Sequence, residues 1–348
     1  MSEFSVPVVS IQAIEKHDNA DSLSLTEVDG CPVIFRTGDF QAGDLAVYLP
    51  VEAVVPTDHK AFSFLATKVG QTKHRIKAKK LRGTFSMGLL VKLQDAFPAG
   101  DLPKEGDDVA ERLGVIKYVE PVHNLSTGGM RRRAADTRFC PVYDIESHRK
   151  YKSVYLPGET VVLTEKVHGC NGRFLVHDLG DGAGPQLMVG SHNYFNLETP
   201  GNVWWIIARQ MDFATKLADP VMAGKVLYGE VYGQVQDLKY GTSQAEPLRF
   251  AAFDIYDVAS GKFVDYQDFR GICEEVKVPT VPVLYIGPFD QERIEAESRG
   301  KTTICDGQIR EGVVIKPAVE RFDRKLGRVI TKLVGEQYLL RKSGTEFQ

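Results

Sequence analysis

Hydrophobic residues in the first 120 positions come in short runs that are separated by glycine and aspartate. The runs cover residues 7–14, 24–28, 31–36, 45–51 and 87–93. Turn pairs such as Asp29-Gly30, Gly38-Asp39 and Gly43-Asp44 lie between them. Short runs with this punctuation are typical of antiparallel strands joined by tight turns. The pattern predicts a small β-barrel or sandwich over residues 1–120, and a five-stranded barrel of the OB type has about this size.

The amino-acid composition of the chain changes between residues 121 and 138. This stretch contains a Gly-Gly pair, many polar residues and three consecutive arginines at 131–133. Such composition is typical of a linker or an exposed loop. We therefore expect a second domain over residues 139–348.

In the second domain, strand-like runs alternate with one run of helical length. The strand-like runs are residues 160–165, 172–177, 226–232, 250–256, 312–315 and 329–333. Residues 202–217 place Trp204, Ile207 and Met211 on one helical face, with Asn202 as the expected N-cap and Pro220 as the stop. The pattern predicts an α+β fold, a mixed α/β domain built on antiparallel sheets.

The composition of the chain says more about its cellular compartment than about its activity. The net charge is −3, so any affinity for phosphate backbones must come from local basic clusters. Five scattered cysteines show neither metal-ligand spacing nor a disulfide framework, which favours a reducing, cytoplasmic setting. The N-terminus does not have the pattern of a signal peptide, and no apolar stretch approaches the length that spans a membrane.

Candidate chemistry begins at Lys166, in the segment EKVHGCN at residues 165–171. Four more segments follow in order: GEVYG at 229–233, FAAFDIY at 250–256, EGVVIK at 311–316 and TKLV at 331–334, with Tyr338 just beyond. Each segment alone is weak evidence, because Lys166 could be a surface lysine and Phe253 a core residue. The ordered set favours covalent nucleotide chemistry, in which a lysine amine attacks a phosphate.

The segments contain the groups that this chemistry needs. A free lysine has a pKa of about 10.4, and neighbouring positive charge or burial lowers it. Lys316, Lys332 and a divalent metal could supply that charge, and the metal would need carboxylates such as Glu230 and Glu311. Phe253 could stack on a purine. Gly169 could let the backbone approach the nucleotide.

These motifs resemble the RNA ligase branch of the covalent nucleotidyltransferases, from about residue 139 to the C-terminus. EKVHGCN carries a histidine where DNA ligases usually have aspartate, and the four later segments occur where that branch has its later motifs. The first domain is similar to one subgroup, the Deinococcus-type RNA ligase, which has an OB-fold domain ahead of the transferase. GTFSMGLLV at 83–91 and GDDVAERLGVIKYVEP at 106–121 carry this second resemblance.

The resemblance implies a role for each matching residue. Lys166 would accept AMP, Glu165 would meet the adenine through its backbone, and Phe253 would stack on the base. His168 and Asn171 would act on the phosphate side or orient water on the metal, while Glu230 would contact the ribose or the metal waters. Glu311 would serve the metal, and Lys316 and Lys332 the α-phosphate.

Two positions depart from the family pattern. His192 follows Ser191 where the family often has arginine, and Val334 stands where a second lysine is frequent. Ribose contact at His192 is therefore in doubt, and Lys332 would act without a partner lysine.

A basic segment in the first domain is the candidate surface for RNA. Its cationic residues are Lys73, Arg75, Lys77, Lys79, Lys80 and Arg82. On one strand, Arg75, Lys77 and Lys79 would share a face suited to phosphate contacts. The alternative is a solvated edge that discourages strand pairing. The arginines at 131–133 could clamp the nucleic acid or belong to a disordered loop.

The sequence thus predicts a monomeric, ATP-dependent RNA ligase that uses Mg²⁺ or Mn²⁺. It would join 3′-hydroxyl and 5′-phosphate ends through lysyl-AMP and an adenylylated 5′ end, in the repair of nicked or splinted RNA duplexes. Two alternatives remain open at this point. One is a capping-type guanylyltransferase that uses GTP, and the other is a non-catalytic RNA-binding protein on a degenerate transferase fold.

Overall fold

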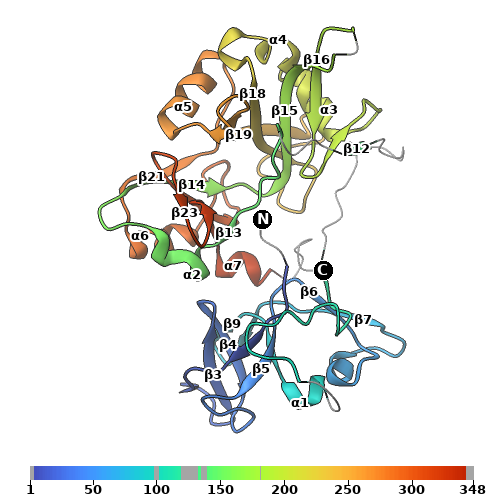
Figure 1. Cartoon of the computed structure of the whole chain (residues 1–348), viewed down its shortest axis with the longest axis vertical. Coiled ribbons are helices and arrows are strands. Elements are labelled where there is room, and N and C mark those ends of the chain that lie inside the picture. The colour runs from blue at the N-terminus through green and yellow to red at the C-terminus, as the bar shows by residue number, and fades with distance from the viewer. Residues whose placement is uncertain (1–3, 98–101, 119–131, 135–138, 181, 342–348) are drawn as a thin grey trace. The chain divides into compact units, whose positions relative to one another are not determined.

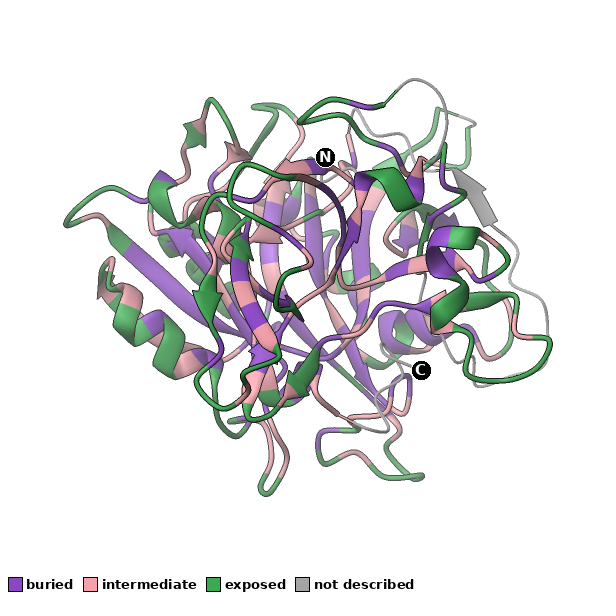
Figure 2. Cartoon of the chain, turned by 90° about the horizontal axis from the view of Figure 1, so that it is seen from below, coloured by how far each residue is buried: buried purple, intermediate pink, exposed green. Residues whose placement is uncertain are grey.

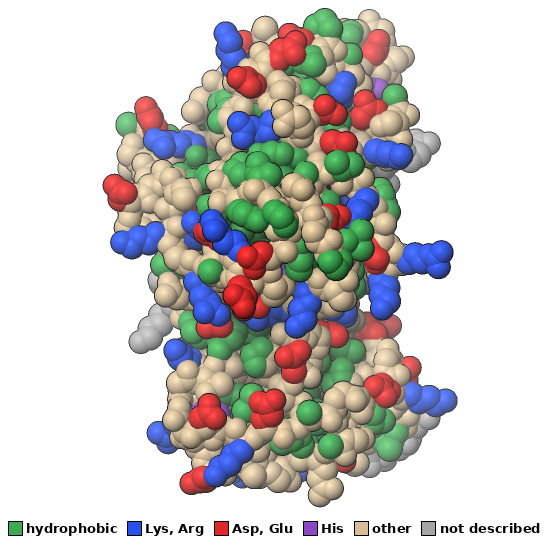
Figure 3. Space-filling view, turned by 90° about the vertical axis from the view of Figure 1, so that its left-hand side faces the viewer, with side chains coloured by type: hydrophobic (Ala, Val, Ile, Leu, Met, Phe, Trp, Pro, Cys, Tyr) green, Lys and Arg blue, Asp and Glu red, His purple; other side chains and the backbone are tan. Residues whose placement is uncertain are grey.

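The computed structural model describes residues 4–97, 102–118, 132–134, 139–180 and 182–341 (Figure 1). The chain divides into two compact units, one of Ser2–Glu120 with Leu339–Gln348 and one of Pro121–Tyr338. Among the described residues, no helix is long and apolar enough to cross a membrane. On the face drawn in Figure 3, lysine and arginine side chains are interspersed with aspartate and glutamate, as the small net charge leads one to expect.

The N-terminal unit consists of short antiparallel strands, as the sequence pattern predicts. Its strands are β1 (Val8–Ser10), β2 (Glu15–Lys16), β3 (Leu23–Val28), β4 (Cys31–Arg36), β5 (Leu45–Leu49), β6 (Ala53–Pro56), β7 (Lys73–Arg75), β8 (Lys79–Leu81), β9 (Thr84–Ser86), β10 (Leu89–Lys92) and β11 (Ile116–Lys117). They form the sheets β1-β5-β10, β11-β6-β7, β2-β3-β4 and β8-β9. A 3-10 helix η1 (Lys60–Leu65) and helix α1 (Leu93–Ala96) complete the unit.

The β3–β4 hairpin shows how the turn residues act. Asp29 and Gly30 both have positive φ, 51° and 75°, between the paired residues Val28 and Cys31. Two central residues with positive φ give the turn that matches the twist of paired strands, which is why Asp-Gly favours it.

The second unit is built on two sheets. The seven-stranded sheet has the order β12 (Arg132–Ala134), β17 (Tyr194–Asn196), β16 (Pro185–Gly190), β15 (Gly169–Asp178), β18 (Lys225–Gly233), β19 (Leu248–Asp257) and β20 (Lys262–Phe263). The five-stranded sheet has the order β13 (Glu146–Ser147), β25 (Thr331–Val334), β22 (Gly312–Pro317), β14 (Thr160–Lys166) and β21 (Val283–Pro288). All described pairs in both sheets are antiparallel except β13–β25, so the predicted antiparallel architecture is confirmed.

Short helices and a small hairpin surround these sheets. The helices are α2 (His148–Tyr151), η2 (Lys152–Val154), α3 (Val203–Gln210), α4 (Phe213–Lys216), η3 (Pro220–Met222), α5 (Tyr266–Glu275), α6 (Gln291–Ser298) and α7 (Glu336–Leu339). The hairpin pairs β23 (Phe322–Asp323) with β24 (Gly327–Arg328). Buried residues concentrate on the central strands (Figure 2).

Two hydrophobic cores explain how the strands of the second unit are oriented. The larger core joins the seven-stranded sheet to α3, α4 and α5, and it includes Val162 of β14. A second core lies on the other face of the five-stranded sheet, with Leu163 of β14 and Ile315 of β22. Because side chains alternate along a strand, one face of β14 is directed toward the seven-stranded sheet and the other toward the second core.

The single helix predicted over residues 202–217 is wrong in extent. Asn202 caps α3 as predicted, its side chain accepting a hydrogen bond from Trp205 N at 3.2 Å. The helix ends at Gln210, however, and Asp212 adopts a left-handed φ of 52° before α4 begins. The break directs Phe213 into the larger core, where it is fully buried.

The interpretation of residues 121–138 as linker or exposed loop also needs correction. Arg132–Ala134 form β12, which pairs with β17 at the edge of the seven-stranded sheet. Without β12, the outer side of β17 would present unpaired backbone N–H and C=O groups, and β12 pairs with them. Arg131 and the remainder of the predicted linker lie outside the described residues.

Candidate active site

Lys166 lies where the chain passes from one sheet to the other. It is the last residue of β14, and Gly169 is the first residue of β15. Val167 and His168 between them are both buried. The position of the candidate nucleophile is therefore set by strands on both sides of a two-residue connection.

Gly169 is required by contact with the neighbouring strand. A Cβ atom added there would lie 2.4 Å from the carbonyl oxygen of Val231 and 3.0 Å from Cγ of Glu230. The close approach of β15 and β18 explains the glycine without any ligand. The predicted approach of its backbone to a nucleotide stays a prediction.

Strand register places three of the candidate lysines on one face of the five-stranded sheet. In β14 and β22, Lys166 pairs with Gly312 and Val162 pairs with Lys316. In β22 and β25, Val314 pairs with Lys332. Since directly opposite residues point to the same side, Lys166, Lys316 and Lys332 share the face that bears Val162. This is the face directed toward the seven-stranded sheet.

The amine of Lys166 is held by Glu311. Lys166 Nζ donates a hydrogen bond to Glu311 Oε1, and the Glu311 side chain is only 2% exposed. Burial alone would raise the pKa of Glu311, but the charge of Lys166 and the nearby His168 ring hold this pKa at about 2. The carboxylate therefore stays ionised, and it stabilises the ammonium form of Lys166.

His168 is fixed by hydrogen bonds through both ring nitrogens. Its Nε2 lies 2.6 Å from Oδ1 of Asp237, and its Nδ1 lies 2.7 Å from the Tyr338 hydroxyl. The Nδ1 atom is also 3.6 Å from Oε2 of Glu311. Asp237 lies in the loop after β18 and Tyr338 lies in α7, so His168 links the connection between β14 and β15 to both. His168 also lies next to the Glu311 carboxylate that binds Lys166.

Glu165 points to the opposite face from Lys166. Its carboxylate accepts hydrogen bonds from the Thr302 hydroxyl and from Thr303, whose N and Oγ1 lie at 2.9 Å and 2.8 Å. Arg310 Nε is 3.7 Å from the same carboxylate. The side chain thus anchors the loop before β22. The adenine contact expected of its backbone stays a prediction.

Asn171 and Glu230 are brought together by the seven-stranded sheet. They are directly opposite each other in β15 and β18, so their side chains share a face. The Asn171 carbonyl accepts a hydrogen bond from Trp204 Nε1 at 2.9 Å, which ties this strand to α3. Asn171 is close to the start of β15, and Glu230 is its direct partner in β18. Both residues therefore lie near the connection between β14 and β15.

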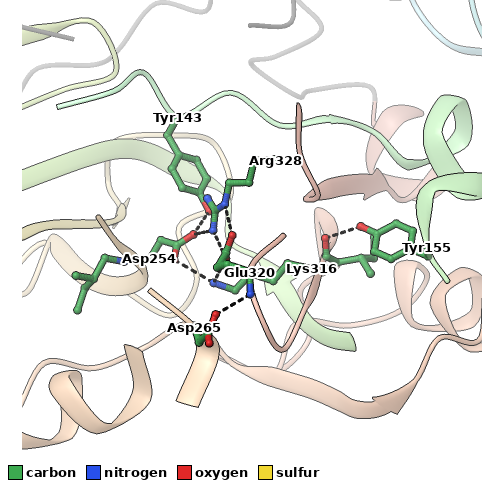
Figure 4. A network of polar contacts seen from close by, with 9 residues as sticks. Tyr143, Tyr155, Asp254, Asp265, Lys316, Glu320 and Arg328 are labelled. Atoms are coloured by element: carbon green, nitrogen blue, oxygen red, sulfur yellow. Dashed lines mark hydrogen bonds and ion pairs between the residues drawn. The ribbon is translucent and has the colours of Figure 1, made fainter. Parts of the chain in front are cut away.

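Tyr143 and Lys316 both contact Asp254 in a cluster of polar and aromatic side chains (Figure 4). The Phe253 ring lies 4.7 Å from the ring of Tyr143, and the Tyr143 hydroxyl donates to Asp254 at 2.6 Å. Lys316 Nζ donates to the other oxygen of Asp254 at 3.0 Å and lies 3.8 Å from Glu320. Arg328 donates to both Asp254 and Glu320 at 2.5 Å.

Asp254 is the centre of this buried cluster. Burial alone would raise the pKa of Asp254, but the charges of Arg328 and Lys316 and the hydrogen bond from Tyr143 hold it below its ordinary value. The Lys316 amine is therefore a buried cation with a buried counterion. Ion pairs with Asp254 and Glu320 fix its position on the sheet face.

The two positions that depart from the family pattern have defined surroundings. His192 Nε2 lies 3.1 Å from Oδ1 of Asp144, and the His192 side chain is 41% exposed. Val334 pairs with Gly312 across β22 and β25 and shares the sheet face of Lys332. Gly312 allows this pairing, since a Cβ there would lie 2.2 Å from the Leu333 carbonyl oxygen.

The predicted ladder of Arg75, Lys77 and Lys79 on one strand is wrong. Lys73–Arg75 form β7, Lys79–Leu81 form β8, and the two strands belong to different sheets. Arg75 is buried, with its guanidinium 3.5 Å from the centre of the Tyr118 ring. Ile76 and Ala78 are buried too, so the chain turns inward between the strands. Lys73, Lys79, Lys80 and Arg82 remain exposed.

Several residues of the site carry no clear signal in the sequence. They are Asp237, Thr302, Thr303, Arg310, Glu320 and Arg328. Asp254 is part of the FAAFDIY segment, but its partners come from segments far away in sequence. Tyr338 follows the last motif closely enough to be noticed, although its contact with His168 depends on the fold.

The carboxylates fit a divalent ion only in part. Among the described residues, no group of three or more His, Cys, Asp and Glu side chains is arranged to hold a metal. Glu311 and Glu230 offer oxygen ligands near the connection between β14 and β15. Such a sparse set matches ions like Mg²⁺, which are usually bound through one or two carboxylates together with substrate phosphates.

Comparison with known proteins gives the following matches. A family model described as RNA ligase matches residues 159–334, half of the 348-residue chain, and an OB-fold domain model matches residues 6–93. No curated protein sequence matches the chain.

Solved structures of an RNA ligase from Naegleria gruberi share the fold. A mutant with ATP and Mn has a TM-score of 0.80 and 23% identity, covering 97% of this chain and 98% of that one. A mutant without ligand has a TM-score of 0.79 and 24% identity, covering 96% of each chain. The form with PPi has a TM-score of 0.79 and 23% identity, with 97% and 98% covered. The predicted OB-like domain and the following domain of antiparallel sheets are confirmed.

Proposed function

Because the chain belongs to the RNA ligase family, we propose that it seals RNA ends with ATP through a covalent lysyl-AMP intermediate on Lys166. Lys166 attacks the α-phosphorus of ATP and releases pyrophosphate. The AMP then passes to a 5′-phosphate end, and a 3′-hydroxyl displaces AMP to form the phosphodiester. The sequence resemblance to RNA ligases agrees with this membership.

One observation carries the proposal. Lys166 shares a sheet face with Lys316 and Lys332 and is bonded to the buried carboxylate of Glu311. A nucleophile on a rigid sheet whose same face bears two further cations suits an attack on a phosphate whose transition state carries negative charge. The ammonium form is no nucleophile, so the amine must separate from Glu311 and lose a proton before it attacks.

The remaining site residues have proposed roles around this attack. Phe253 stacks on the adenine, and the Glu165 backbone contacts the base edge. Glu230 contacts the ribose, and Asn171 and His168 act on the phosphate side. The cation of Lys332 stabilises charge on the α-phosphate directly, whereas Lys316 contributes its charge from the buried cluster around Asp254.

Glu311 and Glu230 would hold a divalent cation, Mg²⁺ or Mn²⁺. When bound, such an ion neutralises charge on phosphate oxygens. The protein's own contribution is to place the carboxylates and to keep Glu311 ionised.

The proposed substrate is RNA, or a duplex containing RNA, with a nick or splinted break that needs repair. Lys73, Lys79, Lys80 and Arg82 of the N-terminal unit are exposed and available to phosphates. We propose that the enzyme acts as a monomer in the cytoplasm. Deletion of residues 1–120 should then impair sealing far more than labelling of Lys166, and equal loss of both would contradict this division of labour.

Incubation with α-labelled ATP or GTP, followed by a denaturing gel, tests the nucleotide chemistry. Covalent label from ATP but not GTP, lost in Lys166→Ala, is the expected result. Label from GTP alone would identify a guanylyltransferase. No label from either nucleotide would support a non-catalytic RNA-binding protein. Label retained in Lys166→Ala would refute the choice of nucleophile.

A further inference from the structure

Three buried side chains form a chain of hydrogen bonds behind the lysine-bearing face of the five-stranded sheet. The hydroxyl of Tyr155 lies 2.7 Å from Thr331 Oγ1, and Thr331 Oγ1 lies 3.0 Å from Nδ1 of His148. His148 Nε2 lies 2.9 Å from Oε1 of Gln291. His148 is 1% exposed, Thr331 0% and Tyr155 5%.

The Tyr155 hydroxyl has a defined donor role in this chain. Tyr155 donates its proton to the Ile315 carbonyl oxygen at 2.8 Å. Its oxygen can then accept the proton of Thr331. The hydrogen bond between Thr331 and Nδ1 of His148 runs in the direction that the tautomer of His148 sets. Burial raises the pKa of Tyr155, so its hydroxyl keeps the proton that it donates.

The chain ends on a pair of residues that directly precede two lysines of the site. Ile315 and Thr331 are opposite each other in β22 and β25. Lys316 and Lys332 follow them and point to the other face. Tyr155 contacts both members of the pair, one through a backbone carbonyl and one through a hydroxyl. Figure 4 draws Tyr155 and Asp254 on either side of Lys316.

We propose that His148, Thr331 and Tyr155 are positioning residues that hold Lys316 and Lys332 in register for charge stabilisation at the α-phosphate. This inference rests on the proposed function, because it assigns a purpose to the placement of two lysines in that reaction. None of the three side chains lies on the lysine-bearing face. They act through the strands β22 and β25.

The short strands explain why such support is needed. β25 has four residues, and its outer neighbour β13 has only two. The ring of Tyr155 stacks on Phe289 at 4.9 Å, which fixes the hydroxyl from the core side. His148 and Gln291 connect the strand pair to α2 and α6. Four elements therefore share the hydrogen bonds that set the position of this strand pair.

A pair of substitutions at Thr331 tests the proposal. Thr331→Val keeps the shape but removes the hydroxyl, and Thr331→Ser keeps the hydroxyl. We expect Thr331→Val to slow single-turnover labelling of Lys166 at saturating ATP by roughly tenfold to a hundredfold, the loss that small misplacement of a catalytic group causes. The KM for ATP should change little, and Thr331→Ser should restore most of the rate. Tyr155→Phe, which retains the stacking ring, should resemble Thr331→Val.

Measurements on folded protein separate positioning from mere loss of stability. All variants are assayed well below their own unfolding midpoints, as determined by circular dichroism. A Thr331→Val enzyme that labels at the wild-type rate would overturn the proposal, as would a Thr331→Ser enzyme that is as slow as Thr331→Val. If instead the wild-type chain takes no label from ATP, the proposed function itself fails, so the two failures are distinct.

Discussion

Lys166 donates a hydrogen bond to the buried carboxylate of Glu311, although the two residues are 145 positions apart in the chain. β14 and β22 make this possible, because Lys166 is opposite Gly312 and Glu311 directly precedes it. The pair brings the first and fourth motifs of the sequence into one site. Its electrostatics have consequences that can be measured.

The first prediction concerns stability in acid. The pKa of Glu311 falls from an ordinary 4.5 to about 2 in the folded chain. A lowered carboxyl pKa stabilises the fold above the unfolded value, and this contribution is lost as the pH falls from 4.5 toward 2. At about 1.4 kcal/mol per pKa unit, the contribution is on the order of 3 kcal/mol.

Urea unfolding of the wild type and Glu311→Gln between pH 7 and pH 3 measures this contribution. The gap in the free energy of unfolding between the two proteins should narrow as the pH falls. A gap that is constant across this range would mean that Glu311 does not titrate as the site geometry implies.

The second prediction concerns the buried cluster around Asp254. Asp254→Asn removes a charge that faces both Lys316 and Arg328. Breaking a buried ion pair from one side leaves an uncompensated charge, so we expect a loss of about 3–5 kcal/mol in the free energy of unfolding. Asp306→Asn, an exposed carboxylate in the same unit, is the matched control and should change stability by less than about 0.5 kcal/mol. Equal midpoints for Asp254→Asn and the wild type in chemical denaturation would contradict this account.

The third prediction compares two glycine-to-alanine substitutions that should change the stability of the protein in opposite directions. Gly169→Ala places a Cβ 2.4 Å from a backbone oxygen of β18, which forces the strands apart and destabilises the protein. Gly271→Ala, in α5, meets nothing within 4 Å and should stabilise the helix by about 0.5–1 kcal/mol. Differential scanning calorimetry of both variants gives the comparison. An unchanged melting temperature for Gly169→Ala would show that β15 and β18 are less closely packed than described.

The fourth prediction concerns RNA binding by the exposed cations of the basic segment. Replacing Lys79, Lys80 and Arg82 with glutamine should weaken RNA binding and reduce the salt dependence, by about 0.7–0.9 in log–log slope for each lost phosphate contact. Fluorescence anisotropy across salt concentrations measures the slope. Lys104→Gln, another exposed lysine of the N-terminal unit, is the control. A slope equal to that of the wild type would exclude these residues from the RNA surface.

Local patterns predicted much of the architecture. β4 occupies the run expected from Cys31 to Arg36, and Asn202 caps its helix as its side chain and position indicate. The break at Asp212 was not predictable from the periodic apolar pattern, because it depends on burying Phe213. Arg75 was predicted to be a surface cation, because its burial depends on Tyr118, which follows β11 and is far away in the sequence.

The candidate site was only partly predictable for the same reason. Motif order indicated Lys166, Glu311 and Lys316, whose residue types suit nucleotide chemistry. The partners of these residues depend on register and on loops, as Asp237 does for His168. Thr331 and Tyr155 have no unusual composition around them, and their relation to the lysines follows from the pairing of β22 with β25.

The two-residue connection between β14 and β15 has a thermodynamic consequence for the proposed nucleophile. Surface loops retain conformational freedom that must be given up when a ligand orders them, whereas Lys166 and Gly169 are already fixed in strands and Val167 and His168 are buried. The backbone entropy of placing the nucleophile is thus spent during folding, before any nucleotide arrives. An insertion here would not be absorbed as it would in a surface loop, because each added residue would displace one sheet against the other.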